Sequence, residues 1–231
     1  MQDSAPRRTK LRRRNSGALA ADLLAVPVVV AVITSAGPAL ARDVYEYRVE
    51  HPKYGEIGTY TNIIDTSGGR TEVHSELHIV VKFLGVTVYR EQADRDEQWR
   101  QDRLVSFHGI TVTNGDTLAI KGEAQGDRFL ITSPAGTVAA PSDIHPSNPW
   151  SLSMMRGDTI MSTKTGRIFR PHVSTDEVDR MTPQGRAVRL RHFEVVTDKR
   201  EQVWFDARGV PVEFSTEKDG TPIYFVLTNS R

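Results

Sequence analysis

The chain of 231 residues contains no cysteine, which excludes disulfides, thiolate metal sites, a thiol nucleophile and a lipid-modified N-terminal cysteine. It also has no surplus of one charge, because 30 Lys and Arg stand against 29 Asp and Glu. Nothing in this balance favours nucleic acid as a partner. A Gly-x-Ser-x-Gly elbow, a phosphate-binding glycine loop and a dinucleotide fingerprint are absent as well. We therefore expect the protein to have no enzymatic activity and to bind no cofactor.

No apolar run is long enough to cross a membrane as a helix, which takes about 20 residues. The run at residues 23–33 contains Pro27 and follows a basic segment at residues 1–15. Ala39-Leu40-Ala41 then supplies the small residues that a signal peptidase accepts. We expect residues 1–41 to be a signal peptide and residues 42–231 to be one mature domain, with a periplasmic or secreted location and no transmembrane segment after cleavage. An uncleaved N-terminal anchor is the alternative.

Beyond residue 41, apolar and polar residues alternate with the period of two that is typical of half-buried strands. The clearest series is Ser75, Leu77, Ile79, Val81 and Phe83. Turn signals separate the series at Ser67-Gly68-Gly69, Asn114-Gly115-Asp116, Gly126-Asp127, Ala135-Gly136, Arg208-Gly209 and Asp219-Gly220. No helical period is sustained. The pattern predicts an all-β protein, an antiparallel meander that forms a curved sheet or partly open barrel of about ten to twelve strands.

Five residues are candidates for contact with an apolar ligand. The irregular segment 140–150 contains three prolines and ends at Trp150, with Met154 and Met155 close behind. This group can either close over an apolar cavity or plug one end of a packed barrel. Trp99 and Trp204 each end the first strand of two similar strand–turn–strand blocks, at residues 97–107 and 201–210. They are either equivalent ligand-facing aromatics or the packing residues of a recurring hairpin.

Two further groups of residues match the patterns of functional sites, but each match also has a simpler explanation. His74, Glu76 and His78 share one strand face and offer metal-ligand atoms, although the solvated face of an amphipathic strand has the same pattern. Lys164-Thr165-Gly166 and Ser215-Thr216-Glu217-Lys218 match two elements of penicillin-recognising serine enzymes. Their order is reversed and Ser215 falls on an expected strand, so we interpret both matches as coincidence.

Several motifs occur together in one order. They are Val81–Tyr89, the hairpin with Glu97 and Trp99, Pro149-Trp150 running on to Thr165-Gly166-Arg167, and Trp204-Phe205-Asp206 with Gly209. Over residues 44–228 the chain resembles an uncharacterised family of exported proteobacterial β-proteins, classed as a domain of unknown function. Phe205 departs from the Trp-Tyr-Asp pattern expected there. The resemblance implies an extracytoplasmic location and a curved antiparallel sheet or barrel. The architecture is also loosely similar to that of periplasmic lipoprotein and lipid carriers.

These observations favour a non-catalytic carrier that binds an apolar ligand, such as a lipid, against the concave face of its sheet. An envelope structural or interaction protein with a packed core is the alternative. An extracytoplasmic hydrolase or metalloenzyme is a third reading that no motif supports. A cavity lined by Trp and Met would favour the carrier, and a filled core would favour the interaction protein.

Overall fold

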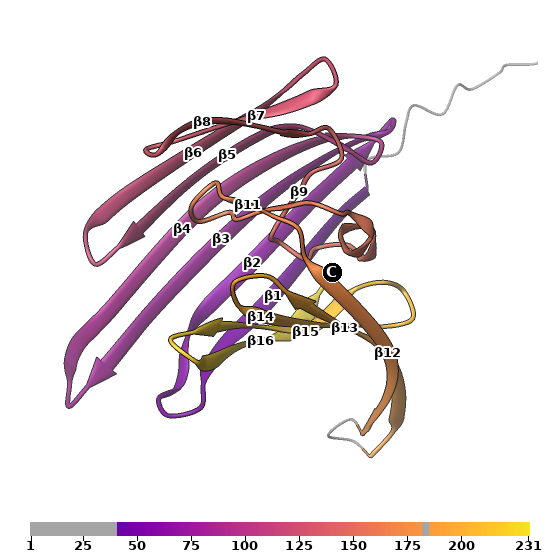
Figure 1. The fold of residues 1–231 in the computed structure, drawn as a ribbon. Coiled ribbons are helices and arrows are strands. Elements are labelled where there is room, and N and C mark those ends of the chain that lie inside the picture. The colour runs from indigo at the N-terminus through magenta and orange to yellow at the C-terminus, as the bar shows by residue number, and fades with distance from the viewer. Residues whose placement is uncertain (1–40, 182–184) are drawn as a thin grey trace, which may run out of the picture. The chain divides into compact units, whose positions relative to one another are not determined.

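The structure is a computed structural model that describes residues 41–181 and 185–231. In these residues thirteen antiparallel strands form one sheet, in the order β12-β13-β14-β15-β16-β1-β2-β3-β4-β5-β6-β7-β8 (Figure 1). The strands are β1 (Ala41–His51), β2 (Gly55–Ser67), β3 (Arg70–Phe83), β4 (Val86–Arg100), β5 (Arg103–Thr113), β6 (Asp116–Gln125), β7 (Arg128–Ser133), β8 (Gly136–Pro141), β12 (His172–Met181), β13 (Ala187–Val196), β14 (Arg200–Phe205), β15 (Pro211–Lys218) and β16 (Thr221–Ser230). The all-β prediction is confirmed. The expected signal peptide lies outside the described residues except for Ala41, where β1 begins.

The sheet is a meander interrupted once. Strands β1 to β8 follow one another, and strands β12 to β16 return so that β16 pairs with β1. Val49 of β1 faces Phe225 of β16 in this pair. The first and last strands of the domain thus lie side by side at the middle of the sheet. Its edges are β8 and β12, which are not paired with each other in the part of the chain that the structure describes.

Turns lie at the six predicted places, and further turns that were not predicted, such as those after β1 and β3, join other strands. Asn114-Gly115 and Asp219-Gly220 have positive φ at both residues, as the two-residue loops of twisted hairpins require. Because the strands are antiparallel, the turns after β1, β3, β5 and β15 all lie at one end of the sheet. We call this end the hairpin end.

The connection between β8 and β12, residues 142–171, crosses the inner face of the sheet. It contains β9 (His145–Pro146), the short 3₁₀ helix η1 (Leu152–Arg156), β10 (Ile160–Met161) and β11 (Ile168–Phe169), and β9 to β11 form a second small sheet. Buried Ile144, Met154 and Met161 pack on residues of the large sheet such as Phe129 and Leu104. This crossing segment therefore supplies part of the core.

The buried residues form two clusters. One lies between β1–β4 and β14–β16 and includes Tyr47, Phe214 and Phe225. The other lies between β2–β8 and the crossing segment. On β3 the buried residues are Val73, Ser75, Leu77, Ile79 and Val81, so the predicted alternation is confirmed up to Val81. Phe83, the last member of the predicted series, is exposed.

The predicted strand number was too small, because the described residues contain thirteen strands in the main sheet and three in the small one. The two-residue strands of the crossing segment are too short to show any period. β12 is exposed along most of its length, so burial imposes no alternation on it. Within the described residues, no helix has the length and hydropathy that a membrane span requires.

Candidate functional site: a lined cavity inside the curved sheet

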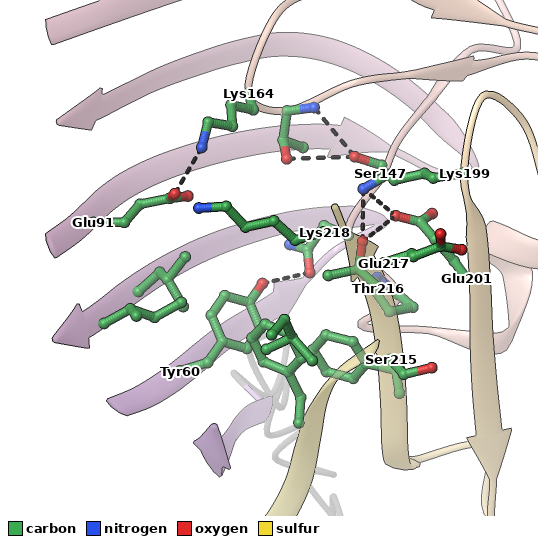
Figure 2. Close-up of a pocket in the computed structure, with 18 of the residues that line it drawn as sticks. Tyr60, Glu91, Ser147, Lys164, Lys199, Glu201, Ser215, Thr216, Glu217 and Lys218 are labelled. Carbon is green, nitrogen blue, oxygen red and sulfur yellow. Dashed lines mark hydrogen bonds and ion pairs between the residues drawn. The ribbon is translucent and has the colours of Figure 1, made fainter. Parts of the chain in front are cut away.

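A cavity of about 630 Å³ lies on the inner face of the sheet. Strands β2, β3 and β4 form one wall, strands β14, β15 and β16 form the opposite wall, and residues 146–164 of the crossing segment complete it (Figure 2). This volume is within the usual range of about 300–1,000 Å³ for small-molecule pockets. His51, Tyr54 and Asp219, which belong to hairpin-end turns or border them, are among its lining residues. The cavity thus extends to the hairpin end of the sheet.

The middle of the cavity is apolar and partly aromatic. Its wall consists mainly of Ile57, Leu77, Ile79, Val81, Met154, Met155, Val203, Phe214, Ile223 and Phe225. The rings of Phe214 and Phe225 are stacked, with centroids 4.4 Å apart. Tyr60 meets both rings edge to face. Such aromatic pairs give a rigid apolar surface, each contributing about 0.5–1.5 kcal/mol beyond its buried area.

Lysines and carboxylates surround the cavity toward the hairpin end (Figure 2). Lys164 Nζ lies 2.6 Å from Glu91 Oε2, and Tyr89 also donates a hydrogen bond to Glu91. Burial alone would raise the pKa of Glu91, but the hydrogen bonds from Lys164 and Tyr89 outweigh it and lower the pKa. The ammonium of Lys218 lies 3.3 Å from the centroid of the Tyr89 ring. Burial, reinforced by the charge of Lys164, lowers the pKa of Lys218.

A second ion pair lies on the opposite wall. Lys199 Nζ is 2.6 Å from Glu201 Oε1 and 2.7 Å from Thr216 Oγ1. Thr216 donates a further hydrogen bond to Glu201. The rim of the cavity is therefore polar on both walls, while its middle is apolar.

The end of the cavity away from the rim is closed by a buried hydrogen-bond network. Tyr60 donates to Asn148 Oδ1 at 2.6 Å, and Asn148 Nδ2 donates to Ser75 Oγ and Glu97 Oε1, each at 3.0 Å. Glu97 Oε2 accepts the indole N–H groups of Trp99 and Trp150, both at 2.9 Å. Burial raises the pKa of Glu97, and these three donors only partly oppose the shift. The network fixes the crossing segment to β2, β3 and β4.

The sequence matches the family model described as domain of unknown function DUF6134 over residues 47–228. The chain belongs to this family. No curated protein matches it. A crystal structure described as a beta-barrel-like protein of domain of unknown function DUF1849 from Brucella abortus is similar to it, with a TM-score of 0.57. The alignment has 8% identity and covers 83% of this chain and 97% of that chain, so the likeness shows the fold alone.

Of the five predicted ligand-contacting residues, Met154 and Met155 line the cavity. Trp150 and Trp99 are brought together behind it, with ring centroids 5.8 Å apart and both indoles bound to Glu97. Neither Trp is among the lining residues.

Trp204 lies elsewhere in the fold. Its ring stacks on His192 at 4.7 Å, and the guanidinium of Arg180 covers it at 4.4 Å. The structure therefore does not bring Trp99 and Trp204 to one surface.

The metal-ligand pattern on β3 is only partly assembled. His74, Glu76 and Asp94 of the described residues place one potential ligand atom each within 4.8 Å of one another, and Asp94 takes the place expected of His78. Both ring nitrogens of His74 are already in hydrogen bonds, with Asp96 at 2.9 Å and Glu76 at 3.2 Å. Burial alone would lower the pKa of His74, but these carboxylates raise it. These hydrogen bonds on the surface account for the position of His74 without a bound metal.

Three residues of the two enzyme-like motifs, Lys164, Ser215 and Lys218, contribute to the cavity wall, but this does not bring their side chains together (Figure 2). Ser215 and Lys218 are three residues apart on the strand β15. Side chains with this separation on a strand point to opposite faces. The Ser-x-x-Lys pair therefore does not form a nucleophile with its base.

The sequence reasoning missed the inward row of β4, in which Glu91, Ala93, Arg95, Glu97 and Trp99 are buried. The residues between them are also polar or charged, so no apolar face distinguishes the inner side from the outer. The alternation of β3 does not supply the row either, because a β-bulge between Val81 and Lys82 shifts the register of the hairpin by one residue. Direct extension of the pattern through the turn at Leu84-Gly85 would therefore assign the opposite face of β4 to the inside.

Proposed function

We propose that this protein is an exported, non-catalytic carrier that binds an apolar or amphipathic small molecule in the cavity of its curved sheet. The observation that carries the proposal is the 630 Å³ cavity, with an apolar and aromatic middle and a charged rim. A packed structural protein has no need of such a space, because each unfilled volume sacrifices packing contacts. The separation of apolar and charged surface matches a molecule with an apolar body and a polar end.

Binding is tested with the apolar fluorophore N-phenyl-1-naphthylamine and a variant that fills the cavity. Ile79 faces the cavity from β3, and Val80, the next residue, faces the other side of the strand. Ile79→Trp is expected to occupy the space and abolish the fluorescence increase. Val80→Trp adds the same side chain on the other face and should bind the probe like the wild type. Equal binding by both variants, or none by the wild type, would contradict the carrier.

Export is the other half of the proposal, supported by the apolar run at residues 23–33 and the Ala39-Leu40-Ala41 pattern. The mature protein is expected to begin at Arg42. Intact mass measurement on the envelope fraction should give the mass of residues 42–231. Native mass spectrometry of the same gently purified material should show bound small molecules. A mass corresponding to all 231 residues would contradict cleavage.

A further inference from the structure

A buried cation lines the cavity without a partner. Arg95, on the inner face of β4, is 7% exposed and belongs to the cavity wall. Its Nε is buried and unbonded, and within residues 41–181 and 185–231 its side chain forms no hydrogen bond or ion pair. A buried charge normally requires both a counter-charge and acceptors for its N–H groups. The available donors of Arg95 therefore suit a ligand that supplies the acceptors.

Glu97 lies two positions further along the same face of β4 and acts on Arg95 only through space. Its carboxylate oxygens already accept hydrogen bonds from Asn148, Trp99 and Trp150. Glu97 thus offsets part of the charge of Arg95 and leaves its N–H groups unused. Gly109 lies opposite Arg95 on β5, and a Cβ there would lie only 3.0 Å from the ring of Phe107, so the glycine accommodates that ring beside Arg95.

We propose that Arg95 binds the carboxylate of a long-chain carboxylic acid whose hydrocarbon chain lies along the apolar wall of the cavity. This inference rests on the proposed function and specifies its ligand class. A guanidinium presents two parallel N–H donors that match a carboxylate. A single guanidinium next to the Glu97 carboxylate fits a head group with one negative charge better than a phosphate dianion.

The geometry of the sheet provides space for the chain of such an acid. Arg95 pairs with Ser75, and the next three inward-facing pairs along the hairpin contain Leu77, Ile79 and Val81 of β3. Six residues of strand from Arg95 to Tyr89 correspond to about 20 Å. The chain would run from Arg95 along this wall toward the hairpin end.

The test compares dodecanoic acid with dodecanol, which has the same chain and no charge, by displacement of N-phenyl-1-naphthylamine. The wild type should bind the acid about ten- to a hundredfold more tightly, the usual effect of a charge-assisted hydrogen-bonded pair. Arg95→Gln should lose this preference and keep the affinity for dodecanol. Lys164→Gln, which removes a rim cation, should retain it.

Each outcome decides between specific alternatives. Equal affinity of the wild type for acid and alcohol overturns the role of Arg95 and leaves the carrier intact, and this comparison does not depend on any variant folding. Loss of the preference in Lys164→Gln but not in Arg95→Gln moves the head group to the rim and also overturns the inference. If neither compound binds, the proposed function itself fails.

A separate observation concerns the hairpin tip, which we define as residues 80–89 of β3 and β4. Of the nine exposed large apolar side chains in the described residues, five are in this tip, namely Val80, Phe83, Leu84, Val86 and Val88. The last register pair of β3 with β2 is Ile79–Gly58, and the last of β4 with β5 is Glu91–Thr113. The tip therefore projects as a two-stranded ribbon at the hairpin end (Figure 1). Such ribbons have little stability of their own in water.

The turn of the tip departs from the others at the same end. Its two central residues, Leu84 and Gly85, both have positive φ. The neighbouring turns place Asn114 and Asp219 at the equivalent position, where a short polar side chain tolerates that backbone and faces water. Leu84 is instead an apolar residue that is 88% exposed. Leucine is not among the residue types that such turns favour. A leucine here suits contact with an apolar environment.

We infer that the hairpin tip inserts into the surface of a lipid bilayer that carries anionic lipids. Residues 83–89 of the tip contain no charged side chain, and Lys82 and Arg90 flank this uncharged stretch, so cations lie where lipid phosphates would be. Val81, Val88 and Tyr89 belong both to the tip and to the cavity wall. An inserted tip would bring the cavity opening to the bilayer, where amphiphiles partition.

The test is co-sedimentation with vesicles of phosphatidylcholine, with and without phosphatidylglycerol. The wild type should bind, more strongly when the anionic lipid is present. Leu84→Asn restores the residue type of the neighbouring turns and should weaken binding about tenfold without loss of stability. Val138→Thr, at an exposed apolar site on β8, is the matched control and should bind like the wild type.

Because the chain has no cysteine, a single introduced cysteine can be labelled uniquely. An environment-sensitive dye on Leu84→Cys should shift to the blue with vesicles, and the same dye on Val138→Cys should not. Absence of vesicle binding by the wild type, or equal shifts at both positions, overturns insertion of the tip. The second result would indicate general adsorption, and the first would leave a protein as the partner of this surface.

Discussion

Glu91 and Glu97 lie on the same inward row of β4, yet their surroundings shift their pKa values in opposite directions. Glu91 meets the ammonium of Lys164, and Glu97 meets only neutral donors at hydrogen-bond distance. The same residue type thus serves two roles within one strand. Glu91 forms an ion pair with a rim lysine. Glu97 binds the crossing segment to β4 through hydrogen bonds, although its carboxylate is buried.

This difference predicts opposite pH dependence of stability. The pKa of Glu97 is raised above 4.5, so its contribution to the free energy of unfolding falls as pH rises from 4.5 through the folded-state value. The pKa of Glu91 is lowered, so its contribution is present above 4.5 and is lost as pH falls through the folded-state value. Urea unfolding of Glu97→Gln and Glu91→Gln, each subtracted from the wild type across this range, should give slopes of opposite sign. Slopes of the same sign would show that the two environments are not as described.

Trp150 provides the second residue-scale prediction. It is half-buried against the second core cluster and donates to Glu97. Trp150→Phe keeps a ring but removes the donor, and should cost about 1.5–3 kcal/mol, the range for a hydrogen bond to a charged group. Trp150→Ala should cost about 3–5 kcal/mol. Both variants should bind N-phenyl-1-naphthylamine nearly as the wild type does. A small loss of stability with much weaker binding in chemical denaturation and titration would instead place Trp150 at the mouth of the cavity.

At the scale of elements, the two edge strands differ in how much they bury. β12 is exposed along most of its length, while β8 buries Ala140 in the second core cluster. Local opening requires less free energy where few apolar contacts are lost. We predict that the amides of β12 exchange with solvent faster than those of β8, and that both exchange faster than β1 and β16. Hydrogen exchange measured by mass spectrometry or NMR tests this order, and equal protection of β12 and β1 would contradict it.

Sequence alone predicted the elements whose one face is apolar and whose other face is polar. β3 satisfies this condition up to Val81, and glycine-containing turns at Asn114 and Asp219 were found for the same local reasons. The inner row of β4 was not predicted, because Glu91, Arg95 and Glu97 are buried through partners distant in sequence. Local periodicity contains no information about a carboxylate on β4 that accepts hydrogen bonds from the crossing segment.

The residues of the candidate site were also predicted only in part. Met154 and Met155 were identified because they follow the proline-rich segment directly, and they line the cavity. The opposite wall, with Val203, Phe214 and Phe225, comes from strands that return after the crossing segment. Its assembly depends on the pairing of β16 with β1, which joins residues about 180 positions apart. No pattern in a short window of sequence reports such a contact.

At the scale of the whole domain, one sheet forms both a packed core and a cavity. The second cluster, under β2–β8, is filled by the crossing segment, whereas between β2–β4 and β14–β16 the same segment covers a space of about 630 Å³. The stability of the domain should therefore depend on what fills this space, because a ligand that binds only the folded state adds its binding free energy to that of folding.

The last prediction follows from this linkage and uses dodecanoic acid as the probe. After removal of bound lipids, a free concentration of about 100 times the Kd should add about 2.7 kcal/mol to the free energy of unfolding. For a domain of this size, 1 kcal/mol raises Tm by about 2–4 °C, so the expected increase is about 5–10 °C in calorimetry. Ile79→Trp should lose the increase, because its indole occupies the site, and Val80→Trp should retain it. An equal increase in Ile79→Trp would mean that the acid stabilises the fold from outside the cavity, and the cavity would then be no binding site for it.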